Sequence, residues 1–189
     1  MRKILVVSAT EKARVFFEDF LTSCKYGVVT TVNDAAEARK ALSNGDFALC
    51  VINSPLPDSS DVRLALETVA QSSCQCLTVV TEDDLPGFSL KLEAAGVFVI
   101  SKPLKRDILW QTLRNIAIVS NRLESMREQN ESLKRRIEDM QLVGRAKALL
   151  ISSLKMSEPQ AHRFLEKQAM ERRMSKAEIS RRVIRTYEE

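Results

Sequence analysis

The sequence predicts an α/β chain in three parts: a five-stranded, parallel, doubly wound domain, then a long coiled-coil helix and a small three-helix C-terminal module. Three observations predict this. Apolar runs alternate with amphipathic stretches over the first hundred residues, a heptad spacing of apolar residues follows Leu104, and residues 143–184 hold three short, basic, helical stretches. We therefore place the domains at residues 1–108, 109–142 and 143–189.

Five short, apolar strands are expected in the first domain. The first, Lys3–Ser8, has no polar face, as expected of a strand buried on both sides of a parallel sheet. The other four are expected at Val28–Val32, Phe47–Ile52, Cys76–Val80 and Val97–Ile100. The intervening helices are expected at Glu11–Leu21, Ala38–Leu42, Val62–Ala70 and Phe88–Ala95. Such alternation implies a parallel sheet with right-handed crossovers and helices on both faces.

Local signals mark both ends of the second of these helices. Asp34 and Glu37 have the spacing of a capping box at its start. Asn44 and Gly45 follow its last apolar residue, and both residue types tolerate the left-handed conformation that ends many helices. The helix is therefore expected to close at Gly45 in that conformation.

Apolar residues of the segment 109–142 follow one another at alternating steps of three and four. The predicted seam consists of Ile116, Leu123, Asn130 and Ile137 at one heptad position and Val119, Met126, Leu133 and Met140 at the other. This stripe is narrow and keeps a period of 3.5, whereas a single helix packed on a domain has a broader stripe at 3.6. Asn130 is the kind of polar residue that fixes register and favours two strands. We predict a parallel homodimer, with an intramolecular antiparallel helix contact as the alternative.

The C-terminal module is more basic than the rest of the chain. Residues 145–189 carry 11 Lys/Arg against 6 Asp/Glu, whereas residues 1–110 carry 12 against 14. This asymmetry predicts an anionic partner for the module alone. No apolar run approaches the ~20 residues that span a membrane, and the N-terminal run is too short for a signal peptide. We therefore expect a cytoplasmic protein that binds nucleic acid and no membrane.

The module's residues predict three helices with a shared core. Capping boxes at residues 157–160 and 175–178 begin the second and third helices. The expected core residues are Val143, Ala146, Leu149, Leu150 and Leu154, then Ala161, Phe164, Leu165 and Ala169, then Ile179, Val183, Ile184 and Tyr187. Tyr187 is the only aromatic residue near the end of the chain, and a core or C-terminal capping role is expected for it.

Catalysis and metal binding are not expected. The four cysteines, at positions 24, 50, 74 and 76, show no paired metal spacing, and the single His162 cannot complete a zinc site. The sequence contains no nucleophile–base pair and no phosphate-binding loop. We therefore predict buried, reduced thiols, no cofactor and no enzyme.

The first 108 residues, with Lys102-Pro103 directly after the fifth strand, resemble the receiver domain of response regulators, which has a flavodoxin-like fold. Residues 53–58, Asn-Ser-Pro-Leu-Pro-Asp, are similar to the loop that carries the family's phosphoacceptor Asp. Thr81 matches the family's switch hydroxyl, and Lys102 matches its phosphate-contacting lysine. The resemblance thus places a degenerate receiver site at the carboxyl ends of the strands.

Three positions depart from the receiver pattern. Asn53 stands at the phosphoacceptor position, and Ser8 and Ala9 stand where the family holds Mg²⁺ with two acidic residues. An amide is not a nucleophile, and Ser and Ala cannot supply the anionic oxygen ligands that Mg²⁺ prefers. We therefore predict a pseudo-receiver that binds a partner or positions the dimer, with a regulatory protein or a ligand as its input.

The C-terminal module resembles the ANTAR family of transcription antitermination regulators over about residues 140–189. The residues that carry this resemblance are Arg145-Ala146-Lys147-Ala148-Leu149-Leu150, Ala161, Leu165, Ala169-Met170 and Arg172-Arg173. Ala148 replaces the family's usual Gly, and Ile151 replaces its usual Met. The resemblance implies a dimer that binds paired stem-loops in the leader of a nascent mRNA and thereby favours an antiterminator over a terminator.

Arginine and lysine on the polar faces of the module are the expected RNA contacts, because arginine binds phosphates and base edges bidentately and lysine adds a flexible charge. The predicted contacts are Arg145, Lys147, Gln168, Arg172, Arg173 and Lys176. Two alternatives stay open. The module could be a helix-turn-helix that presents Arg181, Arg182 and Arg185 to a DNA major groove, or the chain could be a protein-interaction scaffold.

Overall fold

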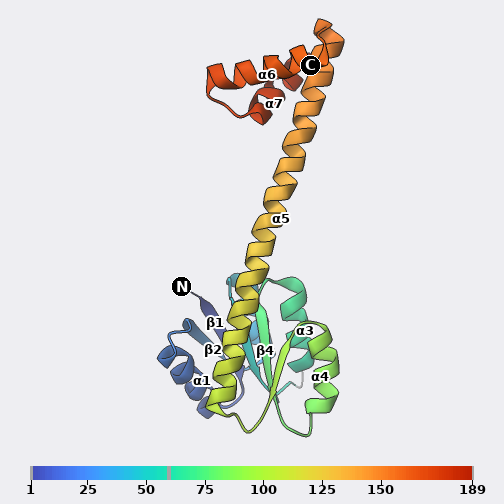
Figure 1. The fold of residues 1–189 in the computed structure, drawn as a ribbon. Helices are drawn as coiled ribbons and strands as arrows, with labels where there is room; N and C mark the ends of the chain where they lie inside the picture. The colour runs from blue at the N-terminus through green and yellow to red at the C-terminus, as the bar shows by residue number, and fades with distance from the viewer. Residues whose placement is uncertain (1, 59–60, 189) are drawn as a thin grey trace. The chain divides into compact units, whose positions relative to one another are not determined.

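Five strands form one parallel sheet in the computed structural model, which describes residues 2–58 and 61–188 (Figure 1). The strands are β1 (Lys3–Ser8), β2 (Val28–Val32), β3 (Leu49–Asn53), β4 (Gln75–Val80) and β5 (Phe98–Ser101). Their order is β2-β1-β3-β4-β5, and every neighbouring pair is parallel. This confirms the predicted fold class, and it is the strand order of flavodoxin-like sheets.

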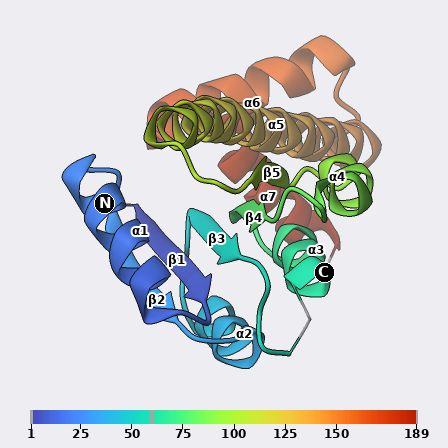
Figure 2. The same cartoon turned by 90° about the horizontal axis from the view of Figure 1, so that it is seen from below.

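Helices cover both faces of the sheet. Helix α1 (Glu11–Ser23) and the first part of α5 (Arg106–Leu154) pack on one face, where Phe17, Leu113 and their neighbours form an apolar core. Helices α2 (Ala35–Asn44), α3 (Asp61–Gln71) and α4 (Leu85–Ala94) pack on the other. Figure 2 shows α2 and α3 on the side of the strands opposite α5. The burial of both faces explains why the strands are almost continuously apolar.

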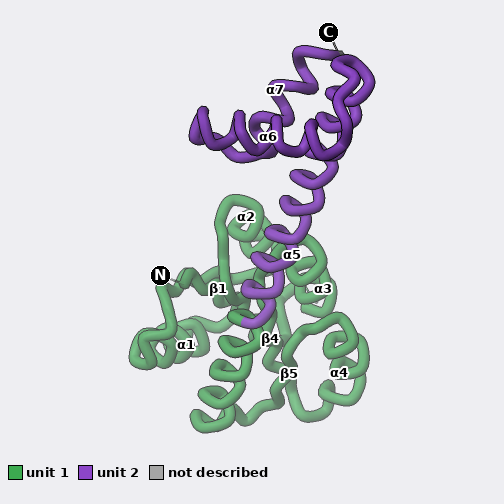
Figure 3. Tube along the Cα trace, turned by 45° about the horizontal axis from the view of Figure 1, so that its top comes forward, with its two compact units in different colours: residues 1–121 green, residues 122–189 purple. Residues whose placement is uncertain are grey.

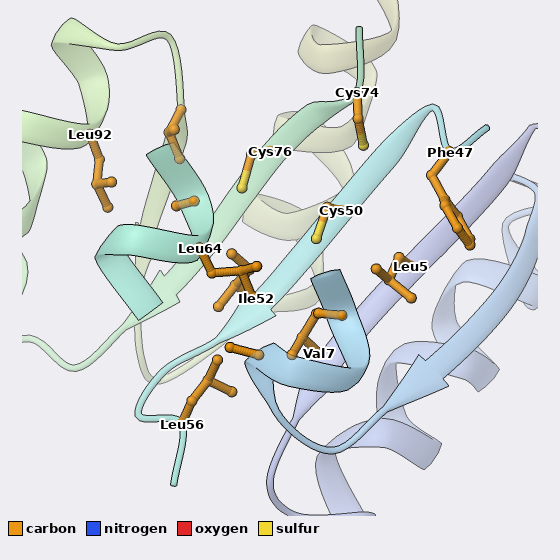
Figure 4. Packing of buried hydrophobic residues seen from close by; sticks show 14 residues of the cluster. Leu5, Val7, Phe47, Cys50, Ile52, Leu56, Leu64, Cys74, Cys76 and Leu92 are labelled. Atoms are coloured by element: carbon orange, nitrogen blue, oxygen red, sulfur yellow. The ribbon is translucent and has the colours of Figure 1, made fainter. Parts of the chain in front are cut away.

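Three thiols lie in the core beneath α2, α3 and α4 (Figure 4). Cys50 on β3 and Cys76 on β4 are partners in the parallel register, and Cys74 directly precedes β4. Hydrogen bonding to Cys76 and burial raise the pKa of Cys50 well above its ordinary value. Burial also raises the pKa of Cys74 to about 12. Cys50 and Cys74 are therefore held in the protonated form.

Helix α2 ends differently from the prediction. The cap at its start is as expected, because the Glu37 backbone N–H donates to Asp34 Oδ1 at 2.8 Å. At its end, however, Gly45 adopts an extended conformation with φ −136°, so the expectation of a left-handed residue is wrong. Glycine is needed for space, since a Cβ at position 45 would lie 2.7 Å from the Phe47 ring.

The chain divides into two compact units, residues 1–121 and residues 122–189 (Figure 3). In the second unit, the C-terminal part of α5 packs with α6 (Glu158–Arg172) and α7 (Lys176–Glu188). Their core consists of Ala146, Leu150, Ala161, Leu165, Ile179 and Val183. Two residues expected in this core, Leu154 and Tyr187, are instead exposed.

The capping residues predicted for α6 and α7 are in place. The Ser157 backbone N–H donates to Gln160 Oε1 at 2.8 Å. At the start of α7, the Ser175 N–H donates to Glu178 Oε2 at 2.8 Å, and the Glu178 N–H donates to Ser175 Oγ at 3.2 Å. Among the described helices, none has the length and apolar character needed to cross a membrane.

Candidate functional site

The carboxyl ends of β1 and β3 hold the first part of the degenerate receiver site. Ser8 and Asn53 are register partners at the last positions of these strands, and both are buried. Asn53 Nδ2 donates to Ser8 Oγ at 2.9 Å. The Asn53 amide stands at the phosphoacceptor position. It is therefore hydrogen-bonded to Ser8, which stands at one of the two positions that hold Mg²⁺ in receivers.

Lys102 contacts the chain that follows β3. Its ammonium donates to the Ser54 carbonyl, and the Ser54 hydroxyl donates to Asp61, the first residue of α3. Asp61 also accepts from the Leu56 N–H at 3.0 Å, so its carboxylate forms hydrogen bonds with both Ser54 and Leu56. Burial lowers the pKa of Lys102, and the negative charge of Asp61 opposes that shift. Lys102 thus stabilises this loop through a backbone carbonyl.

The two remaining residues of the predicted site have separate roles. Thr81 follows β4 and donates its hydroxyl to Asp84, directly before α4. Ala9 is exposed after β1. At the carboxyl edge of the sheet, the structure therefore joins Asn53 to Ser8 and Lys102 to Ser54, the residue after Asn53, and it leaves Thr81 and Ala9 outside those hydrogen bonds.

Arg14 contributes to this edge and was not predicted. Its guanidinium donates to the Ser8 carbonyl at 2.8 Å from the first turn of α1. The sequence signal is an arginine in the helix that follows the emptied metal position. Since the edge combines a neutral amide, hydroxyls and cations, its chemistry does not suit an aspartyl phosphate with Mg²⁺.

The predicted seam lies along α5. Six of its apolar side chains are exposed in the single chain, namely Val119, Leu123, Met126, Leu133, Ile137 and Met140, and Asn130 is exposed among them. None of these residues belongs to an apolar core of the described chain. Ile116 requires a correction, because it is only 1% exposed and packs in the core against the sheet. The stripe open to a partner therefore begins at Val119.

Two of the predicted RNA contacts are held in ion pairs. Lys147 Nζ lies 2.7 Å from Glu158 Oε1, and Lys176 Nζ lies 3.0 Å from Glu166 Oε1. The hydrogen bonds with these lysines lower the pKa of each glutamate. All four groups are at least partly exposed, so each pair adds little stability but compensates one positive charge.

The arginines at the end of α6 are exposed. Arg172 Nε donates to Gln168 Oε1 at 3.0 Å, and this bond uses one of the guanidinium's five N–H donors. Arg173 is exposed and ends the helix with φ 52°, a left-handed conformation that favours glycine. Lys25 and Lys155 adopt the same left-handed conformation, so it is not particular to Arg173. Arg145 on α5 is also exposed.

A groove of about 420 Å³ lies between α6 and α7. Its lining residues are Phe164, Gln168 and Arg172 of α6 and Ile179, Arg182, Val183, Arg185, Thr186 and Tyr187 of α7. Sequence reasoning selected Gln168 and Arg172 but assigned Phe164 and Tyr187 to the core. It gave Arg182 and Arg185 only to the DNA alternative. The missed signal is spacing, because the lining residues of each helix recur at three- and four-residue steps on one face.

The three helices, their buried small residues and their exposed arginines agree with a known family. Residues 131–184 match the ANTAR domain. The match confirms the resemblance predicted from residues of α5 and α6, and it begins within the segment predicted as coiled coil.

A relative of comparable length is known. The chain is 22% identical over 187 residues to the transcriptional regulatory protein PdtaR of two strains of Mycobacterium tuberculosis, and the alignment covers 98% of this chain and 90% of the relative. The chain therefore aligns with this relative through both of its units.

Solved structures resemble the N-terminal part. The chemotaxis protein CheY4 of Vibrio cholerae superposes with a TM-score of 0.55 at 22% identity, over 61% of this chain and 98% of that chain. A signal receiver domain of an HD domain-containing protein from Pseudomonas fluorescens Pf-5 gives 0.59 at 20% identity, over 66% and 92%. At these identities the likeness shows the receiver fold alone, which confirms that part of the prediction.

Proposed function

We propose that this protein is a dimeric, RNA-binding transcription antiterminator whose receiver-like domain has no phosphoacceptor chemistry. The observation that carries the proposal is the ANTAR match over a three-helix module with exposed arginines on its surface. The name of the full-length relative, a transcriptional regulatory protein, supports a role in transcription. Binding to paired stem-loops in a leader transcript would favour the antiterminator over the terminator.

The proposed RNA contacts are Arg145, Lys147, Gln168, Arg172, Arg173 and Lys176. For Lys147 and Lys176, contact with phosphate requires that each lysine exchange its carboxylate partner for the RNA. We retain the division into residues 1–108, 109–142 and 143–189 as receiver-like, dimerising and RNA-binding parts. The proposed seam runs from Val119 to Met140.

Filter binding of the full-length protein tests the choice of nucleic acid. An RNA with two hairpins is compared with a double-stranded DNA of the same sequence, because unpaired RNA loops expose base edges that a duplex hides. We expect tighter binding to the RNA. Preferred binding to duplex DNA would favour a DNA-binding regulator, and binding to neither would favour a scaffold.

The dimer is tested by the pair of variants Ile137→Glu and Arg136→Glu. Both add an acid to the same turn of α5, but only the first places it in the exposed apolar stripe. We expect Ile137→Glu to sediment as a monomer and to lose at least about a hundredfold in affinity for a two-hairpin RNA, since avidity of linked sites is lost. Affinity for one hairpin should change little. A dimeric Ile137→Glu variant would contradict the proposed seam.

A further inference from the structure

The groove between α6 and α7 combines an apolar floor with a cationic rim. Ile179 and Val183 are almost fully buried at its floor, and Phe164 packs beside them. Tyr187 lines the groove and is 38% exposed. A volume of about 420 Å³ lies within the range of roughly 300–1,000 Å³ that is typical of small-ligand sites.

The rim carries positive charge without an acidic neighbour in the lining. Arg172 comes from α6, and Arg182 and Arg185 come from α7. None of the described residues that line the groove is Asp or Glu. Within the described part of the chain, neither Arg182 nor Arg185 lies within ion-pair distance of an acid, although the positive charge of Arg182 helps to lower the pKa of Glu178. By contrast, Arg181, one residue away on α7, lies 3.8 Å from Asp139 and does not line the groove.

Gln168 adds a polar group whose hydrogen bonds can be exchanged. Its Oε1 accepts from Arg172, and its Nε2 donates to Glu171 Oε2 at 3.0 Å. All these partners are at the surface, so a ligand in the groove could replace either bond without leaving a buried group unsatisfied. An amide presents a donor and an acceptor together, which suits the edge of a heterocyclic base.

We infer that this groove receives a single unpaired nucleobase of the bound RNA, with Tyr187 stacking on its face, Gln168 at its edge, and Arg182 and Arg185 on the flanking phosphates. The inference rests on the proposed RNA-binding function and specifies it. An aromatic ring beside guanidinium groups is the combination that binds splayed-out bases of single-stranded loops. A paired base in a duplex could not enter, because its faces are covered by its neighbours. An apolar peptide would leave the three arginines without a counter-charge.

The test uses full-length protein and one hairpin RNA. The hairpin is enriched from a pool with a fixed stem and a randomised loop, and each loop nucleotide is then replaced in turn by an abasic one. We expect one abasic position to weaken binding to the wild type by about tenfold or more. In Tyr187→Ala, which should bind the intact hairpin about tenfold more weakly, the same abasic position should cause no further loss.

Two matched comparisons complete the test. Tyr187→Phe keeps the ring and should bind within about twofold of the wild type, because stacking needs only the π-face. Arg182→Gln should weaken binding more than Arg181→Gln, although both remove one charge from the same turn of α7. Thermal unfolding followed by circular dichroism checks that each variant is folded.

The outcomes separate the two proposals. If hairpins are enriched but the abasic profile of Tyr187→Ala equals that of the wild type, the groove does not hold a base, and the RNA-binding function stands. If Arg182→Gln and Arg181→Gln are equivalent, the cationic rim is not the phosphate contact, and the inference fails in that part. If no hairpin is enriched, the RNA-binding function fails, and the inference fails with it.

Discussion

The carboxyl edge of the sheet and the surface of the α6–α7 module contain similar polar side chains in opposite states. At the edge, Asn53, Ser8 and Lys102 satisfy one another or nearby backbone groups, and the first two are buried. On the module, Arg172 and Arg173 are exposed, and Arg172 uses only its Nε–H in the hydrogen bond with Gln168. The first region is closed by its own hydrogen bonds, whereas the second has donors left for a ligand.

The two units satisfy their polar side chains in different ways. A receiver site that has lost its carboxylates needs other groups to satisfy its buried polar atoms, and here the Asn53–Ser8 hydrogen bond does so. The module holds Arg172 and Arg173 at the surface, where water solvates them and where, under the proposed function, RNA phosphates would replace that water. Under the proposed function, the first unit therefore has no phosphoacceptor chemistry, and RNA recognition belongs to the second unit.

Among the tests of this comparison, the largest expected effect concerns the difference between exposed arginines and lysines that are already in ion pairs. If two phosphate contacts are lost, Arg172→Gln combined with Arg173→Gln should weaken hairpin RNA binding roughly twentyfold at about 0.1 M salt. The slope of log affinity against log salt concentration should become shallower by about 1.4. The matched variant, Lys147→Gln with Lys176→Gln, should lose less affinity, because both lysines already pair with glutamates. Filter binding over a salt series measures both. Equal slopes for the two variants would show that the ion pairs do not distinguish these cations.

The next effect tests whether the receiver-like edge is closed. Asn53→Asp places a carboxylate where the side chain is only 8% exposed and where no acidic metal ligands follow β1. We expect a loss of about 1–2 kcal/mol in the free energy of unfolding at neutral pH, measured by urea denaturation, because burial disfavours the charged form. The loss should shrink as the pH falls and the new carboxylate takes up a proton.

Asn53→Ala serves as the control for that variant, since it removes the same hydrogen bond without adding charge. Neither the wild type nor Asn53→Asp should incorporate phosphate from acetyl phosphate in the presence of Mg²⁺. Labelling of Asn53→Asp would mean that the edge still binds metal, and labelling of the wild type would refute the pseudo-receiver.

Much of the fold could be predicted, because each strand is an apolar run and burial on both faces leaves few alternatives. β1 and β2 have the predicted bounds, and the other strands differ by one or two residues at their ends. The exception at Gly45 is instructive. The sequence shows that glycine ends the helix, but only the packed Phe47 ring shows that the reason is space and not a left-handed turn.

The sites were less predictable, because they depend on contacts between distant segments. Ile116 fits a heptad as well as it fits the core, and only the position of α5 on the sheet decides between them. Tyr187 has apolar spacing on α7, yet it lies at the open side of a groove that needs α6 to exist. Arg14 likewise has no motif, and its role appears only when its guanidinium reaches the Ser8 carbonyl.

The smallest expected effect tests how firmly the N-terminal unit is closed. The pKa of Cys74 is about 12 in the folded chain, so above pH 9 the unfolded chain loses a proton that the folded chain keeps. This group therefore contributes stability that is fully present below about pH 9 and is lost progressively as the pH rises toward 12. Between about pH 8 and pH 10, Cys74→Ala should lose about 1 kcal/mol less unfolding free energy than the wild type. Urea denaturation at the two pH values measures this difference, in which the titration of groups that do not interact with Cys74 cancels. Parallel losses in the two proteins would mean that the thiol ionises in the folded state, and that the core beneath α2 and α3 admits water.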